Sequence, residues 1–195
     1  MEHNNCELKQ YMAPGKTVHL IGIGGVSMRP LGLVLRGMGM EVTGSDMNAS
    51  VSTDELISQG IRVYIGHRGE NVNGADCVIR TAAVHNDNPE IAAARAYGIP
   101  VYERAQAWGQ IMKAYKNAIC ISGTHGKTTT TSMMTHILMA AETDPTVMIG
   151  GHLPLLGAGH RVGGGDTILL ESCEYCDSFL NFFPTLAVGL NVEAD

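Results

Sequence analysis

The chain has few aromatic residues, few charged residues and no long apolar run. Aromatic residues make up 5% of the sequence and charged residues 16%, whereas 45% is hydrophobic, which excludes a disordered chain. Scarce aromatics together with 24 glycines favour an α/β fold with many tight strand-to-helix turns over a β-sandwich. No apolar run approaches the roughly 20 residues that a membrane-spanning helix needs, so we expect no membrane partner.

The sequence also lacks an excess of positive charge. It holds 13 lysines and arginines against 19 aspartates and glutamates, with a net charge of −6 and a pI near 5.7. This balance argues against a nucleic acid or an anionic membrane as a partner. An anionic ligand would therefore have to be bound by backbone amides and a few local cations.

Cysteines are few and odd in number, and no signal peptide precedes them, so we expect reduced thiols in a cytoplasmic protein. One C-x-x-C pair is present, but a structural zinc site usually needs a second pair, and the sequence has none. Packing is therefore favoured over a metal or redox role. The five cysteines are Cys6, Cys77, Cys120, Cys173 and Cys176.

Strands alternate with helices along the chain, which predicts a doubly wound parallel sheet. The pattern runs from "TVHLIGIGG" to "IPVY" and then starts again at "NAICIS", so two α/β domains are predicted. The second is short and ends just after a strand, so we expect a truncated piece of a longer protein. The predicted parts are an N-terminal arm (1–13), a Rossmann-like domain (14–104), a linker helix (105–117) and a partial P-loop-type ATP-binding domain (118–195).

The stretch "CISGTHGKTTTT" combines an apolar strand, a glycine turn and a helix start. Backbone N–H groups of such a turn meet the positive end of the following helix and bind phosphate. Gly123 and Gly126 leave room for phosphate oxygens. Lys127 can reach the β- and γ-phosphates, and the hydroxyl of Thr128 can bind Mg²⁺. Ile121 stands where the usual spacing requires glycine, so this is a shortened variant; a chance turn is the less favoured alternative.

A magnesium site needs a further oxygen ligand, usually an acid at the end of a neighbouring strand. The segment "DTILLESCEYCDSFL" offers Glu171 at the strand end and Glu174 just beyond it. Both carboxylates suit Mg²⁺, and a solvated surface position for Glu174 is the alternative.

The earlier turn "GIGGVS" also follows a strand. A dinucleotide-binding G-x-G-x-x-G motif would need glycine at the position of Ser27. Asp46, at the end of the second strand, lies where a ribose-binding acid is expected. The turn can therefore hold a diphosphate at a helix N-terminus without being an NAD site, and a plain strand-to-helix turn is about equally compatible.

From about Thr17 to its end, the chain resembles the Mur ligases. The resemblance rests on "GIGGVSM", "GSD", "TAAVHNDNPE", "GTHGKTTTT", "IGG", "ESCEYCDSFL" and "LNVEAD", in that order. It implies a UDP-binding domain, a central ATPase and an amino-acid-binding domain, the last of which this chain lacks. The implied activity is ATP-dependent joining of L-alanine to the muramyl carboxylate of UDP-N-acetylmuramate through an acyl phosphate, in peptidoglycan precursor synthesis. We expect the truncated chain to bind nucleotides without turnover.

The resemblance also implies a role for individual residues. Lys127, His125 and Glu174 would be catalytic, with His125 facing the muramyl carboxylate or the transferred phosphate. Thr128 and Glu174 would hold Mg²⁺. The residues at the ATP would be Gly123, Thr124, His125, Gly126, Lys127, Thr128 and Thr129. The residues at the sugar nucleotide would be Gly22, Gly24, Gly25, Ser27, Asp46, Thr81 and Ala82. Arg29 and Pro30 depart from the small residues expected there, and the chain ends at Asp195, before a metal-binding histidine of the family motif.

The implied cofactors are ATP and Mg²⁺, and the implied partners are UDP-N-acetylmuramate and L-alanine, with the protein a monomer or homodimer. One alternative is a family member that joins a preformed peptide to the same sugar nucleotide, or another Mur-type ligase. The "GIGG" turn favours the alanine-joining form, since "GICG" is expected in the peptide-joining one. A second alternative is a nucleotide-binding fragment without turnover. An NAD-dependent oxidoreductase is disfavoured by Ser27 and by the second, lysine-bearing turn.

Overall fold

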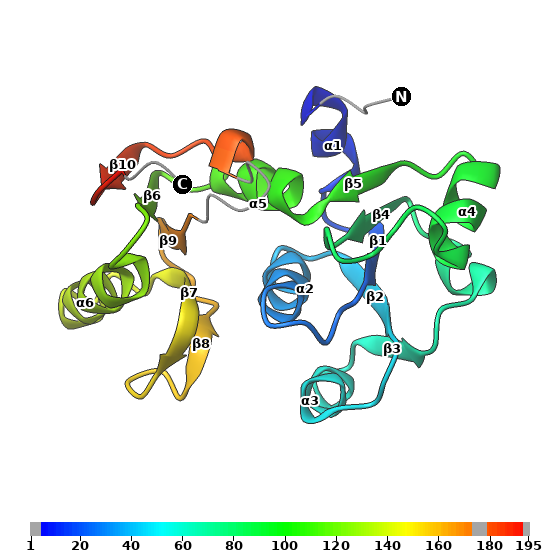
Figure 1. Ribbon diagram of the computed structural model, residues 1–195, viewed down its shortest axis with the longest axis horizontal. Coiled ribbons are helices and arrows are strands. Elements are labelled where there is room, and N and C mark those ends of the chain that lie inside the picture. The colour runs from blue at the N-terminus through cyan, green and yellow to red at the C-terminus, as the bar shows by residue number, and fades with distance from the viewer. Residues whose placement is uncertain (1–4, 173–178, 193–195) are drawn as a thin grey trace. The chain divides into compact units, whose positions relative to one another are not determined.

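The computed structural model describes residues 5–172 and 179–192. The chain divides into two compact units, Met1–Ala107 and Trp108–Asp195, and each contains one five-stranded sheet (Figure 1). In the described part of the chain, no helix is both long and apolar enough to cross a membrane.

The first unit holds a fully parallel sheet in the order β3-β2-β1-β4-β5. The chain order reverses on either side of β1, and open α/β sheets bind ligands beside such a reversal, at the carboxyl ends of the strands. The parallel α/β fold predicted from the sequence is confirmed. Its elements are α1 (Asn5–Tyr11), β1 (Thr17–Ile21), α2 (Met28–Gly37), β2 (Glu41–Asp46), α3 (Val51–Ser58), β3 (Arg62–Ile65), the 3₁₀ helix η1 (Gly69–Val72), β4 (Cys77–Arg80), α4 (Pro89–Ala96) and β5 (Val101–Glu103).

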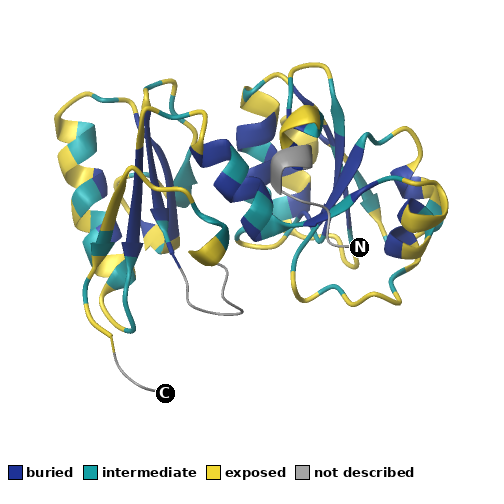
Figure 2. Cartoon of the chain, turned by 90° about the horizontal axis from the view of Figure 1, so that it is seen from above, coloured by how far each residue is buried: buried dark blue, intermediate teal, exposed yellow. Residues whose placement is uncertain are grey.

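Helices cover both faces of this sheet because successive strand residues point to opposite sides. On one face, α2 packs closely: a Cβ atom on Gly32 would lie 3.2 Å from Leu20 of β1. On the other face, Ile21 packs with Ile91 and Ala94 of α4 in one buried cluster. The central strands β1 and β4 are accordingly buried, whereas the outer sides of the helices are exposed (Figure 2).

The second unit has the strand order β10-β6-β9-β7-β8, parallel except for the antiparallel pair β7–β8. Helix α5 (Arg104–Met112) spans the division between the units. The other elements are β6 (Asn117–Ser122), α6 (Lys127–Ala140), β7 (Thr146–Leu153), β8 (Ala158–Arg161), β9 (Thr167–Glu171) and β10 (Leu186–Gly189).

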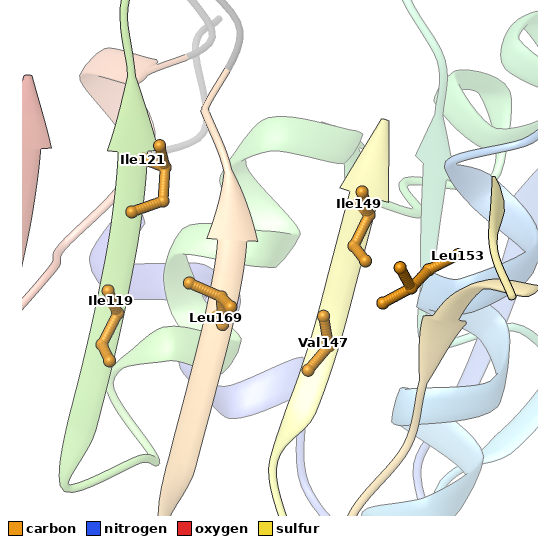
Figure 3. Packing of buried hydrophobic residues seen from close by; sticks show 6 residues of the cluster. All are labelled: Ile119, Ile121, Val147, Ile149, Leu153 and Leu169. Carbon is orange, nitrogen blue, oxygen red and sulfur yellow. The ribbon is translucent and has the colours of Figure 1, made fainter. Parts of the chain in front are cut away.

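Alternate residues of β6, β7 and β9 form the core of the second unit (Figure 3). Met134 and Leu138 of α6 pack against this cluster. Burial of one large aliphatic side chain stabilises a fold by about 1.5–3 kcal/mol, so the cluster fixes α6 on the sheet and with it the loop from β6 to α6. The cluster consists of Ile119, Ile121, Val147, Ile149, Leu153 and Leu169.

Three of the described elements, α1, η1 and β8, were not predicted from the sequence. The segment expected to be an N-terminal arm forms α1, and Leu8 in this helix is fully buried. Strand β8 pairs with β7 across a tight turn in which Gly157 has φ 63°. The sequence of β8, "AGHR", shows no apolar alternation, so only its pairing with β7 makes it a strand.

Candidate functional site

The turn between β6 and α6 depends on two glycines. Gly126 precedes α6 with φ 85°, in the left-handed region that glycine favours. Gly123 has φ 143°, and a Cβ atom there would lie 3.1 Å from Leu190 Cβ and 3.2 Å from the backbone nitrogen of Asn191. A larger residue at either position would distort the turn that the sequence identified as a phosphate-binding loop.

Lys127 is the first residue of α6, and its ammonium group contacts the loop that precedes this helix. Its Nζ donates hydrogen bonds to the carbonyl oxygen of Gly123 and, at 3.2 Å, to that of Thr124. The structure thus holds a positive charge at the N-terminus of α6, where the helix dipole also attracts anions.

His125 is held in this loop through its main chain. The side-chain amide of Asn191, just after β10, accepts a hydrogen bond from the His125 N–H at 2.9 Å and donates one to the His125 carbonyl at 3.0 Å. Sequence reasoning assigned no role to Asn191, which stood only within the family pattern "LNVEAD". The two segments are 66 residues apart in the sequence, so only pairing of β10 with β6 brings them together.

Thr128 lies beside a carboxylate at the end of β9. Its hydroxyl donates to Glu171 Oε1 at 3.0 Å, and the N–H of Gly150 donates to Glu171 Oε2 at 2.8 Å. Glu171 is thus the predicted acid that the structure places next to Thr128, whereas Glu174 lies outside the described residues. Within 5–172 and 179–192, no group of three or more His, Cys, Asp or Glu side chains is arranged to hold a metal.

The first glycine turn is hydrogen-bonded to the end of β2. The N–H groups of Gly22 and Ile23 donate to the Ser45 carbonyl at 2.8 and 3.0 Å. The N–H of Gly24 donates to Asp46 Oδ2 at 2.9 Å, and a Cβ atom on Gly24 would lie 2.9 Å from the same oxygen. The structure therefore places Asp46, the predicted ribose-binding acid, in contact with the turn itself.

The start of α2 accommodates both residues that depart from the family pattern. The Gly25 carbonyl accepts hydrogen bonds from the N–H groups of Met28 and Arg29 at 3.0 and 2.9 Å. The Arg29 guanidinium forms an ion pair with Glu55 of α3. Pro30 is buried in the first turn, where a missing N–H costs no helical hydrogen bond. Ser27 precedes the helix, and its side chain makes no capping hydrogen bond.

Thr81 and Ala82 follow β4 at the same edge of the sheet. A Cβ atom on Gly22, which has φ 80°, would lie 3.2 Å from Thr81 Cγ2, so Thr81 borders the glycine turn. Ala82 is exposed. In the other unit Thr129, on the first turn of α6, is exposed as well.

Cys77 and Cys120 do not contribute to either site. Cys77 and Cys120 are free and buried, and burial raises the pKa of each thiol to about 12. Such thiols stay protonated and are poor nucleophiles and metal ligands. Cys173 and Cys176, the C-x-x-C pair, lie outside the described residues.

The sequence model of the Mur ligase family, described as its catalytic domain, matches residues 17–116. Over 180 residues the chain is 50% identical to UDP-N-acetylmuramate–L-alanine ligase of Acetivibrio thermocellus, covering 92% of this chain and 38% of that protein. The enzyme of the same name from Clostridium botulinum is 48% identical over the same share of this chain and 39% of its own length. The chain therefore spans well under half the length of these relatives.

Solved structures show the same fold. The crystal structure of UDP-N-acetylmuramate–alanine ligase from Thermotoga maritima matches with a TM-score of 0.80 and 32% identity, covering 89% of this chain and 40% of that one. The UDP-N-acetylmuramate:L-alanyl-γ-D-glutamyl-meso-diaminopimelate ligase from Neisseria meningitides matches with a TM-score of 0.83 and 26% identity, covering 93% of this chain and 62% of that one.

Proposed function

This chain belongs to the Mur ligase family, and we propose that it is the sugar-nucleotide-binding and ATP-binding part of a ligase that joins L-alanine to UDP-N-acetylmuramate. Its similarity to alanine ligases at 50% and 48% identity supports the choice of amino acid. We further propose a cytoplasmic enzyme, monomeric or homodimeric, that serves peptidoglycan precursor synthesis. The free thiols of Cys77 and Cys120 agree with a reducing compartment.

The observation that carries the proposal is the loop between β6 and α6. Two conformationally required glycines, a lysine ammonium and the N-terminus of a long helix meet there. Each of these features favours bound phosphate, and together they form the arrangement that phosphate-binding loops share. A chance strand-to-helix turn would need neither Gly123 nor the amide clamp from Asn191.

Mg²⁺ fits the donor atoms of this site. Thr128 Oγ1 and Glu171 Oε1 are oxygen donor atoms 3.0 Å apart, and Mg²⁺ prefers a few carboxylate or hydroxyl oxygens together with phosphate and water. Thr128 and either Glu171 or the sequence-predicted Glu174 would hold the ion. When bound, it would neutralise charge on the phosphates.

In the first unit we assign the UDP group to the turn at Gly22, Gly24 and Gly25. This turn opens α2 at the carboxyl edge of a parallel sheet, beside β1, where the strand order reverses. Asp46 Oδ2 is bound to the turn. Among the residues that the structure describes, its Oδ1 has only a long contact of 3.5 Å with the Asn48 N–H, which leaves it able to accept from a ribose hydroxyl. Ser27, Thr81 and Ala82 are proposed to line the same site.

The proposed reaction needs charge neutralisation and positioning rather than a covalent enzyme intermediate. An oxygen of the muramyl carboxylate attacks the γ-phosphorus of ATP, ADP leaves, and an acyl phosphate forms. The amine of L-alanine then attacks the acyl carbon, phosphate leaves, and the amide bond is complete. Lys127 would exchange its contacts with loop carbonyls for phosphate oxygens and stabilise the charge of the first transfer. His125, whose main chain is fixed by Asn191, would contact the carboxylate or the transferred phosphate.

A peptide-joining ligase is the second candidate, because the Neisseria enzyme whose name states that activity has the same fold at a TM-score of 0.83. A nucleotide-binding fragment without turnover is the third. For the 195-residue chain by itself we expect binding without amide formation.

Separate calorimetric titrations of the 195-residue chain with UDP-N-acetylmuramate and with MgATP test the proposal. We expect each ligand to bind at one site. Lys127→Ala should weaken MgATP binding at least about tenfold, because a charged hydrogen-bond donor to phosphate is lost. It should leave UDP-N-acetylmuramate binding unchanged, and Lys116→Ala, which removes an exposed lysine in the same unit, should change neither affinity. Failure of the unaltered chain to bind either ligand would refute the proposal.

A further inference from the structure

The first unit contains a buried acidic side chain that the site described above does not use. Glu90 is the second residue of α4 and is completely inaccessible to solvent. A buried carboxylate costs several kcal/mol unless it is paired and hydrogen-bonded, so its surroundings must compensate for the charge. Its polar neighbours come from β1, β2, the loop after β3 and η1, and they are His19, Ser45, His67 and Asn71.

Both carboxylate oxygens of Glu90 accept hydrogen bonds. The Ser45 hydroxyl donates to Oε2 at 2.6 Å, and the Asn71 amide donates to Oε1 at 2.5 Å. His67 Nδ1 lies 3.1 Å from Oε2 and 3.1 Å from Ser45 Oγ. One carboxylate thus joins the end of β2 to the segment that follows β3.

Burial raises the pKa of Glu90, but the effects of His19, Ser45 and Asn71 outweigh burial and hold the pKa below its ordinary value. The hydrogen bonds that lower the pKa come from Ser45 and Asn71. His19 Nε2 lies 3.7 Å from Oε1, which is beyond hydrogen-bond distance. The carboxylate is therefore ionised at neutral pH and can only accept hydrogen bonds.

This charge state fixes the tautomer of His67. An ionised carboxylate offers no hydrogen, so His67 Nδ1 must carry the hydrogen that it shares with Glu90 Oε2. Nε2 of a neutral His67 ring is then a hydrogen-bond acceptor. Without Glu90 the ring could adopt either tautomer.

The same residues support the sugar-nucleotide site through the main chain. The Ser45 carbonyl holds the N–H groups of Gly22 and Ile23. The N–H of Gly66, directly before His67, donates to the carbonyl of Asp46 at 2.8 Å. Asn71 also donates to the Gly66 carbonyl at 3.1 Å.

We propose that Glu90 is a positioning residue for the sugar-nucleotide site, acting through the Ser45 hydroxyl on the glycine turn and through His67 and Asn71 on the loop beside Asp46. The proposal rests on the assignment of UDP-N-acetylmuramate to this turn. A carboxylate that served only to fill the core would affect stability, whereas a positioning residue affects affinity for one ligand of a folded protein.

The test compares Glu90→Gln with Glu70→Gln in the 195-residue chain, since Glu70 is exposed on the neighbouring η1. Glutamine keeps the size of the side chain, but its amide nitrogen cannot accept a hydrogen bond, so one of the two acceptor oxygens of Glu90 is lost. We expect Glu90→Gln to weaken UDP-N-acetylmuramate binding about tenfold, because buried donors lose their acceptor. Its MgATP affinity should stay within about twofold of the unaltered chain, and Glu70→Gln should change neither affinity. Ring nitrogen NMR should show Nδ1–H in His67 of the unaltered chain and a mixture of tautomers in Glu90→Gln.

Unchanged UDP-N-acetylmuramate affinity in a folded Glu90→Gln chain would overturn the proposal, as would an equal fall in both affinities. If Glu90→Gln does not fold, Ser45→Ala is the alternative test, because it removes only the hydroxyl that donates to Glu90. We expect Ser45→Ala to weaken sugar-nucleotide binding about threefold. No change in this affinity would again overturn the proposal. If the unaltered chain does not bind the sugar nucleotide, the proposed function fails separately. Amide exchange then tests the positioning: Gly22 and Ile23 should exchange faster in Ser45→Ala while Val42, within β2, stays protected.

Discussion

At the scale of single residues, the loop between β6 and α6 depends on a side chain, Asn191, to which the sequence motifs assign no role. Asn191 donates to and accepts from the main chain of His125, which fixes the centre of the loop from outside it. Lys127 is identifiable from its neighbours in the sequence, but its partners Gly123 and Thr124 and the clamp by Asn191 are properties of the folded loop. The roles of these residues in ligand binding stay predictions.

Asn191→Ala should weaken MgATP binding about three- to tenfold and lower the free energy of unfolding by about 1 kcal/mol, since two exposed hydrogen bonds are lost. Asn191→Asp keeps the acceptor for the His125 N–H but places a negatively charged oxygen against the His125 carbonyl, so it should weaken MgATP binding at least as much as alanine does. Calorimetric titration and urea unfolding would measure both effects. An alanine variant that binds MgATP as tightly as the unaltered chain would show that the clamp is dispensable.

At the scale of elements, α6 is a helix because of its packing rather than its composition. It begins with a lysine and four threonines, and β-branched residues lower helix propensity. The hydroxyl of Thr135 donates to the Thr131 carbonyl at 2.7 Å, and Met134 and Leu138 pack on the sheet. The helix is thus stabilised by the same core that fixes β6, which keeps the loop between them in one conformation.

Gly126→Ala tests that conformation. Alanine at φ 85° costs about 1–2 kcal/mol, whereas the added Cβ meets only Leu190 Cδ1 at an ordinary 3.4 Å. We expect lower stability by that amount and weaker MgATP binding. Gly189→Ala in β10 is the control, because its Cβ would meet nothing within 4 Å and its φ is not positive. Equal effects of the two substitutions in urea unfolding and titration would contradict the strained turn.

At the scale of the whole molecule, both α/β units contain the same device, a glycine turn from a strand into a helix. In the proposed function, this device would let a chain of net charge −6 bind two anionic ligands, because backbone amides and one lysine would supply the positive potential locally. The acid behaviour of the first unit should depend on its buried carboxylate, because Glu90 is ionised without contact with water.

A group whose pKa is lower in the folded than in the unfolded protein stabilises the fold above its unfolded pKa, and this contribution is lost as the pH falls through the folded pKa. Glu90 has its pKa lowered from 4.5, and Asp76, beside Lys16 and the Thr17 N–H, has its pKa lowered from 3.8. We therefore expect no contribution to the pH dependence from these groups near neutrality and a decline in stability below about pH 4.5.

Urea unfolding followed by circular dichroism at a series of pH values would measure the decline. Glu90→Gln should show a shallower acid slope than Glu70→Gln, because the titrating carboxylate is gone while Asp76 remains. Identical slopes in the two variants would mean that folding does not lower the pKa of Glu90.

The sequence by itself determined the parts of this protein that depend on local patterns. Apolar runs, glycine turns and helix-capping residues lie close together in the chain. The sequence therefore predicted that the second strand ends at Asp46 and that a strand lies at "NAICIS", and the structure has both. The family and the lysine-bearing loop were identified from short motifs for the same reason.

Only the tertiary structure decided which distant side chains meet. Asn191 reaches His125 across 66 positions, Thr128 reaches Glu171 across 43, and Ser45 reaches Glu90 across 45. These contacts depend on which strands are neighbours and which face a residue takes. Strand order arises from the packing of the whole sheet, which no local periodicity specifies.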